Sequence, residues 1–237
     1  MNKLLNRLVV LLAISLFSAI VVSCESEEKI PGDWGYESKH LVTGYVFPEE
    51  LEVEAGAIDG ALVTFSVKAK GVVVSHHLKK VWGEFSDLTE EDVVERSRLF
   101  DSMAILYKDT AYNRMVTLRE NWALAYPIDS VSIISNVGYD VNHPVGSNLY
   151  DVVTMTSYSY GELVLNGYVQ GDCQLEKRVS ELTQDNRTLM TAKFGDMLYC
   201  TGRFSLPQTA NPQDCQLTVT YFFSNGLKLS ASTQVKL

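Results

Sequence analysis

The stretch between Asp140 and Asp151 gathers residue types that could do chemistry. It holds, in order, Asp140, Asn142, His143, Asn148 and Asp151. Oxygen-rich loops of this kind bind calcium, but an EF-hand needs an oxygen ligand at its fifth position, where this chain has Pro144. The sequence therefore excludes an EF-hand.

Turn chemistry accounts for the same residues without a ligand. Asp140 can cap a turn, the proline fixes its own φ, Gly146 allows a chain reversal and Leu149 can enter the core. Asp140, His143 and Asp151 are nevertheless retained as a possible functional loop. The fold decides whether these three side chains converge on a pocket or only close a turn.

Histidine and cysteine do not occur at the spacing of a metal site. Apart from Cys24, the candidates are His40, His76, His77, His143, Cys173, Cys200 and Cys215. Structural zinc sites pair their ligands two to four residues apart, and no such pair is present. His76 and His77 adjoin in an expected strand, so their side chains point to opposite faces. We expect no metal and no other cofactor.

Hydrolase motifs such as G-x-S-x-G and H-E-x-x-H are also absent, so no catalytic residue is assigned. The paired acids Glu49-Glu50 and Glu90-Glu91 are interpreted as solvated. A hydrolase whose site is assembled only in three dimensions stays open, because the spacing of catalytic carboxylates is set by the fold.

The N-terminus has the pattern of an export signal. Two cations, Lys3 and Arg7, precede an apolar run of fifteen residues from Leu8 to Val22, which is short for a membrane-spanning helix. The run ends at Val21-Val22-Ser23-Cys24, which resembles a lipobox. The resemblance implies cleavage of residues 1–23 and lipid modification of Cys24, so that the partner is a lipid bilayer. An ordinary secretory peptide and an uncleaved anchor helix are the alternatives.

Residues 24–38 read as a flexible acidic tether. Glu25-Ser26-Glu27-Glu28-Lys29 resembles the signal that sends lipoproteins of Bacteroidetes-type bacteria to the cell surface, which implies the outer membrane, with the periplasmic face as the alternative. The chain carries a net charge of −9, and removal of residues 1–23 brings it to about −11. No Lys/Arg face is evident, so we expect no nucleic-acid partner.

The rest of the chain, 39–237, is predicted to be mainly β, as an antiparallel β-sandwich, Ig-like or related, with one inserted helix near 87–107. Alternation of apolar and polar residues, or short β-branched runs, predict strands at 40–47, 61–68, 71–75, 130–134, 152–158, 163–169, 217–223 and 227–235. Asn225-Gly226 predicts a tight hairpin between the last two. Asp87 and Thr89 can each cap the helix, and the acids Glu90, Glu91 and Asp92 predict its first turn.

The residues Ile133-Ile134-Ser135-Asn136 and the stretch 139–151 resemble a recurring segment of uncharacterised Bacteroidetes lipoproteins, with the pattern D-x-x-H-P-x-G-x-x-L-x-D after a strand. The lipobox and the C-terminal hairpin belong to the same resemblance. It implies a lipoprotein with a β-sandwich domain of unknown function and supplies no activity.

We therefore expect a membrane-anchored binding module for a glycan or an envelope protein; a hydrolase or a purely structural component are the alternatives. Several aromatic residues could stack on sugar rings or fill the core: Tyr158, Tyr160, Tyr168, Tyr221, Phe222 and Phe223. In an exported protein two of the last three cysteines could form a disulfide, and we favour Cys200 with Cys215, although sequence alone does not fix the pairing. Three segments resemble O-glycosylation acceptors: Asp101-Ser102-Met103, Asp109-Thr110-Ala111 and Asp129-Ser130-Val131.

Overall fold

Strands dominate the computed structural model, which describes residues 36–76, 87–116, 121–169, 173–194, 197–210 and 212–237. The predicted signal peptide, Cys24 and His77 lie outside the described residues. Within those residues no helix is both long enough and apolar enough to cross a membrane. Residues 36–38, which the sequence assigned to the tether, instead form a short strand.

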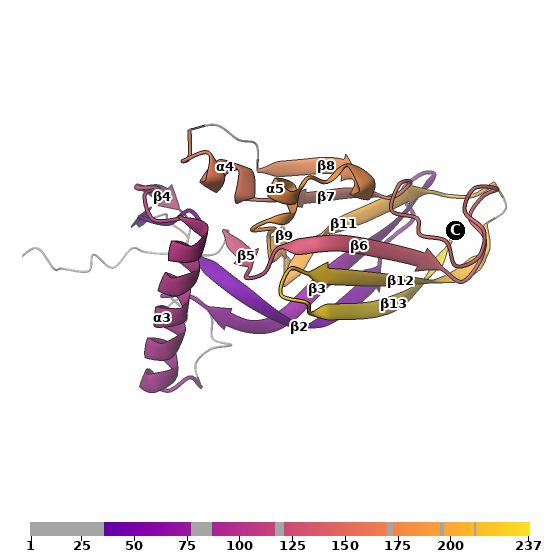
Figure 1. The fold of residues 1–237 in the computed structure, drawn as a ribbon. Coiled ribbons are helices and arrows are strands. Elements are labelled where there is room, and N and C mark those ends of the chain that lie inside the picture. Colours follow the sequence, from indigo (N-terminus) through magenta and orange to yellow (C-terminus); the bar gives the residue numbers. More distant parts are fainter. Residues whose placement is uncertain (1–35, 77–86, 117–120, 170–172, 195–196, 211) are drawn as a thin grey trace, which may run out of the picture. The chain divides into compact units, whose positions relative to one another are not determined.

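The larger sheet has six strands in the order β5-β2-β3-β11-β7-β8 (Figure 1). Their bounds are β5 Trp122–Leu124, β2 Gly44–Ala55, β3 Leu62–Val74, β11 Cys200–Pro207, β7 Thr154–Tyr158 and β8 Gln174–Arg178. Neighbouring strands are antiparallel except β5, which pairs parallel to β2. The two runs predicted at 61–68 and 71–75 are one continuous strand, β3.

The smaller sheet has three antiparallel strands in the order β13-β12-β6. They are β6 Ile128–Ser135, β12 Asp214–Phe223 and β13 Lys228–Lys236. The Asn225-Gly226 hairpin joins β12 and β13 as predicted, with Gly226 at a φ of +85°. Glycine carries no penalty at a positive φ, so this turn fixes the register of the pair.

A core cluster formed by residues of both sheets joins them as a sandwich. On β3, Phe65 is buried and stacks on Phe204 of β11 at a centroid distance of 5.2 Å. Leu217, Val219 and Tyr221 of β12 face the same core, at the two-residue period of a half-buried strand. The predicted fold class, a mainly β sandwich with a helix, is confirmed.

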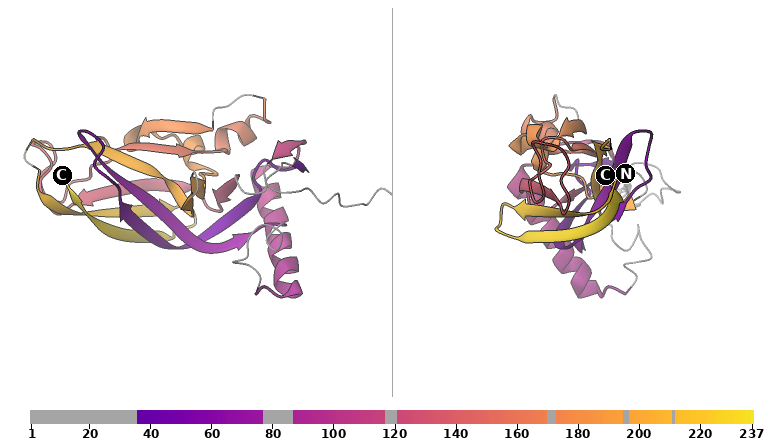
Figure 2. Two further views of the ribbon diagram at one scale, coloured as in Figure 1. Left: turned by 180° about the vertical axis from the view of Figure 1, so that it is seen from behind. Right: turned by 90° about the vertical axis from the view of Figure 1, so that its right-hand side faces the viewer.

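Helix α3, Glu90–Tyr107, is the predicted insertion. Thr89 caps it through a capping box with Asp92, and the acids of the first turn favour its N-terminus. Phe100 and Ala104 bury its inner face against a second cluster that includes Tyr45 of β2. The helix lies across one end of the sheets, beside the paired strands β1, Tyr36–Ser38, and β4, Arg114–Val116 (Figures 1 and 2).

The strand predicted at 163–169 is wrong. These residues instead contribute to helix α4, Gly161–Leu165, and to the turn after it, where Gly167 and Tyr168 both have positive φ. Val164 and Tyr168 are buried, but Asn166, which would share their face in a strand, is exposed, so the burial does not follow strand alternation. The remaining short elements are η2 Val179–Glu181, α5 Gln184–Arg187, β9 Lys193–Phe194 and β10 Met197–Leu198.

Candidate functional site

His143 lies between the two carboxylates that the sequence singled out. Its Nδ1 is 2.7 Å from Asp140 Oδ1, and its Nε2 is 3.1 and 3.3 Å from the two carboxylate oxygens of Asp151. We call these three residues the His143 clamp. Its side chains converge on one another, and none of them lines either of the two pockets described below.

The loop between β6 and β7 is built around this clamp. Asp140 Oδ1 also accepts hydrogen bonds from the backbone N–H groups of Asn142 and His143. Further along, Asn148 Oδ1 accepts from the N–H groups of Ile133 and Tyr150, which ties the loop to β6. Gly146 has a φ of +82° and Leu149 is buried, so the turn predicted for this stretch is confirmed.

The electrostatics of the clamp favour a charged imidazole. The hydrogen bond to Asp140 raises the pKa of His143; desolvation opposes this, and the bond to Asp151 adds to the rise. Desolvation alone would raise the pKa of Asp140, but the bonds from the His143 ring and from two backbone N–H groups hold it below its ordinary value. Because both ring nitrogens are engaged, His143 has no nitrogen left to act as a base.

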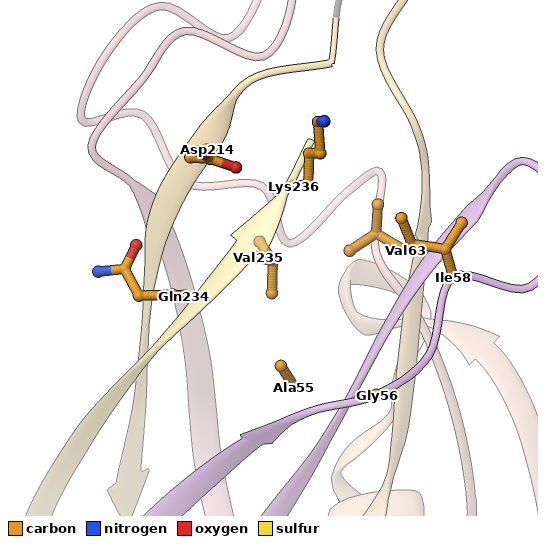
Figure 3. Close-up of a pocket in the computed structure, with 8 residues that line it drawn as sticks. All are labelled: Ala55, Gly56, Ile58, Val63, Asp214, Gln234, Val235 and Lys236. Carbon is orange, nitrogen blue, oxygen red and sulfur yellow. The ribbon is translucent and has the colours of Figure 1, made fainter.

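A pocket of about 480 Å³ opens between the two sheets near the C-terminus (Figure 3). We call it the end pocket. One side comes from the β2–β3 hairpin and the other from β12 and β13, and its lining residues are Ala55, Gly56, Ile58, Val63, Asp214, Gln234, Val235 and Lys236. Its described lining residues are mostly apolar, with one acid, Asp214, and one base, Lys236, and none of them is aromatic.

The clamp loop lies next to the end pocket. Gln213, which precedes the pocket residue Asp214, donates from Nε2 to the Gly138 carbonyl at 3.4 Å. Two apolar side chains of the loop stand in solvent, Val141 at 93% exposure and Val145 at 68%. We call the end pocket together with these two valines the apical face. It lies at the opposite end of the sheets from α3 and β1 (Figures 1 and 2).

A second pocket, of about 420 Å³, lies near the bulge of β2 between Pro48 and Glu50, opposite Gly71 of β3. The paired acids Glu49 and Glu50 line it together with Lys70 and Arg96. Arg96 donates to the Val73 carbonyl at 3.0 Å, which attaches α3 to β3. These acids therefore lie in a mixed-charge setting rather than among other carboxylates.

The predicted Cys200–Cys215 disulfide is not formed. Cys200 is buried on β11 of the larger sheet and donates from Sγ to the Gly202 carbonyl. Cys215 is buried on β12 of the smaller sheet, beside Ser135. Each thiol is packed within its own sheet, and burial raises the pKa of both, which keeps them protonated and unreactive.

His40 and His76 lie near α3. His40 Nδ1 bonds to the carbonyl oxygen of Asp109, His76 Nε2 lies 2.8 Å from Asp101, and both rings meet the edge or face of Phe100. Among the described residues no group of three or more histidine, cysteine or acidic side chains is placed to hold a metal ion.

Asp109 is a buried carboxylate that the sequence presented only as part of a glycosylation-like segment. Its oxygens accept from the backbone N–H groups of Leu41 and Val42 and from the Tyr168 hydroxyl, each at 2.7 or 2.8 Å. Burial raises its pKa despite these bonds. The Asp109 carboxylate thereby holds the segment before β2 against the end of α3. No local pattern in the sequence indicates this contact.

The aromatic residues proposed as a sugar platform do not gather on one surface. Tyr160, Tyr168, Tyr221 and Phe223 are buried. Tyr158 and Phe222 are partly exposed, but they lie on strands of different sheets. Most of this group therefore belongs to the two cores.

Comparisons with known proteins found no match: no protein-family model, no curated protein and no solved structure resembles the chain significantly.

Proposed function

We propose that this protein is a lipid-anchored envelope protein that binds a protein partner through its apical face. The observation that carries the proposal is the apical face itself, in which a pocket of about 480 Å³ adjoins a hydrogen-bonded loop with two exposed valines. Pockets of this size accept a small molecule or a few side chains of a partner. Rigid apolar groups beside a pocket are typical of protein-binding sites.

The chemistry of the apical face favours a protein over a glycan. Sugar-binding surfaces offer aromatic rings for stacking, whereas the exposed groups here are aliphatic: Ile58, Val141 and Val145. Asp214 and Lys236 add one charge of each sign at the pocket, which suits a polar rim around an apolar contact. The proposed partner is therefore a protein segment that inserts one or two apolar side chains.

The anchor in this proposal is Cys24. The lipobox-like end of the apolar run supports it. β1, where the described part of the chain begins, lies at the end of the domain opposite the apical face (Figure 1). A lipid-held domain would then present the apical face away from the bilayer. Cells of the native host grown with labelled palmitate should label the wild type and not the Cys24→Ala variant.

The partner is tested by crosslinking in those cells followed by capture of the full chain. Val141→Asp together with Val145→Asp should abolish the crosslinked product, because two charges would enter the apolar contact. Leu165→Asp, a half-exposed residue on α4, is the matched control and should leave the product unchanged. Equal capture by all three proteins, or binding of purified glycans that depends on the two valines, would overturn the proposal.

A further inference from the structure

The outer side of α3 carries apolar residues that the domain leaves uncovered. Phe100 and Ala104 face the core, and Leu99, Ile105 and Leu106 lie about 100–140° around the helix axis from Phe100. Ile105 is 69% exposed and Leu106 67%. Together with Leu99 and Val169 we call these residues the outer patch.

Val169 extends the outer patch from a second element. Its neighbour Tyr168 bonds through its hydroxyl to Asp109, just beyond the C-terminus of α3, and Arg114 donates to the Tyr168 carbonyl. The loop is thereby held against the last turn of the helix, and Val169 remains 85% exposed.

The chain enters the domain at this same end. β1 pairs with β4 beside α3 and begins at Tyr36, twelve residues after Cys24. Twelve residues span at most about 43 Å even when fully extended. An acyl chain on Cys24 would therefore hold the outer patch within reach of the bilayer at high effective concentration.

The charges around the patch also suit an anionic membrane surface. Lys39, Lys108 and Arg114 are exposed at this end, although Glu37 lies among them and the first turn of α3 is acidic. Contact through the C-terminal half of α3 keeps the acidic first turn away from the lipid headgroups, and the acid in that half, Asp101, is paired with His76.

We propose that the outer patch docks on the lipid bilayer, with α3 lying in the interface plane and its C-terminal half inserted among the headgroups. The proposal rests on the lipid anchor of the proposed function and adds to it a fixed orientation of the domain on the membrane. One apolar helix face is too small to bind a bilayer tightly alone, so the acyl anchor and the patch act together.

The test uses the lipidated full chain in vesicles of phosphatidylethanolamine and phosphatidylglycerol. Leu106→Cys, in a Cys173→Ser background, carries an environment-sensitive fluorophore, and Val141→Cys in the same background is the control at the apical face. Vesicles should raise the emission at position 106 several-fold and shift it to the blue, and leave position 141 unchanged.

Hydrogen exchange on the lipidated protein provides a measurement that needs no substitution or label within the folded domain. Amides at 99–108 should exchange several-fold more slowly on vesicles than in the Cys24→Ala protein mixed with the same vesicles, while amides at 138–146 should not differ. Flotation of the protein with vesicles is recorded in parallel.

The outcomes separate the two proposals. If the protein floats but position 106 and residues 99–108 do not respond, the docking is wrong and the anchor stands. If the protein carries no acyl chain and does not float, the anchor is wrong and the docking falls with it. A response at position 106 that follows protein density instead of lipid would overturn the docking in favour of a second copy of the chain.

Discussion

The His143 clamp should contribute a pH-dependent part of the stability, and His143→Gln removes it while keeping a polar side chain. The ring bonds to Asp140 at 2.7 Å and to Asp151 at 3.1 Å, and its side chain is only 11% exposed. Hydrogen bonds to charged groups contribute about 1.5–3 kcal/mol when shielded, and much less when exposed. Since both carboxylates are close to half exposed, we expect His143→Gln to lower the free energy of unfolding by about 1–2 kcal/mol in total.

The sign of the pH dependence follows from the directions of the two pKa shifts. The raised pKa of His143 means that its stabilisation is fully present below its unfolded pKa, about 6.5, and is lost as pH rises through the folded value. The lowered pKa of Asp140 means that its stabilisation is present above its unfolded pKa, about 3.9, and is lost as pH falls. The clamp is therefore strongest between about pH 4 and pH 6.5.

The assay is urea unfolding of the wild type and His143→Gln at pH 5.5 and pH 8.5, followed by tryptophan fluorescence. The difference in the free energy of unfolding between the two proteins should be largest at pH 5.5. In a thermal melt at that pH, the variant should have a melting temperature about 2–8 °C lower. His76→Gln is the matched control, because the His76–Asp101 pair is more exposed and should contribute under about 0.5 kcal/mol. If His143→Gln lowers the free energy of unfolding equally at both pH values, or more at pH 8.5, the His143 clamp does not depend on a charged imidazole.

Five further substitutions, two of them for comparison, are measured by the same unfolding assay. Asp109→Ala leaves two backbone N–H groups and a tyrosine hydroxyl without their acceptor, and should cost about 3 kcal/mol; a loss under 1 kcal/mol would contradict the buried acceptor. Tyr45→Phe removes a buried hydroxyl that has no hydrogen-bond partner among the described residues, and it should leave the stability unchanged or raise it. Tyr107→Phe removes the 2.7 Å hydrogen bond to the Ala125 carbonyl and should cost about 1 kcal/mol. Gly71→Ala would place a Cβ 1.8 Å from the Phe47 carbonyl oxygen of β2 and should lower the free energy of unfolding by more than about 2 kcal/mol. Gly60→Ala should lower it by only about 1 kcal/mol, because there only the positive φ is unfavourable.

Local signals in the sequence located the elements that are set by local chemistry. The possible caps Asp87 and Thr89 with the acids after them indicated the start of α3, and Asn225-Gly226 indicated the hairpin of β12 and β13. Both signals depend on residues within a few positions of each other. No local pattern in the sequence predicts which strands distant in sequence pair, such as β11 between β3 and β7. The strand predicted at 163–169 is wrong because short apolar runs fit either period, and only the structure shows that these residues form the end of α4 and a turn.

The residues of the candidate site could be predicted from the sequence, but what they do could not. Asp140, His143 and Asp151 stood out by residue type, but the sequence left open whether the imidazole faces a pocket or its own loop. Only the fold, which brings Asp151 to the second ring nitrogen, shows that the histidine is engaged on both sides. Asp109 escaped notice because its donors lie about sixty residues away in both directions.

The disulfide was mispredicted for a related reason. Spacing in the chain and a glycine- and proline-containing connection favoured Cys200 with Cys215, yet the connection crosses from the larger sheet to the smaller one. A bridge needs Cα atoms within about 7 Å and Cβ atoms facing each other. Cysteines on different sheets meet that condition only where their strands face across the core at the same level, which sequence separation does not specify.

The clamp links the chemistry that the sequence suggested to the surface that the structure exposes. Val141 lies between Asp140 and His143, so the bonds that hold the imidazole also fix the backbone that presents the valine. An apolar side chain on an ordered loop loses little conformational entropy when a partner covers it, whereas the same residue on an unrestrained loop would lose more. In the proposed function His143 therefore acts as a positioning residue for the apical face, and its effect on partner binding should follow the same pH window as its effect on stability.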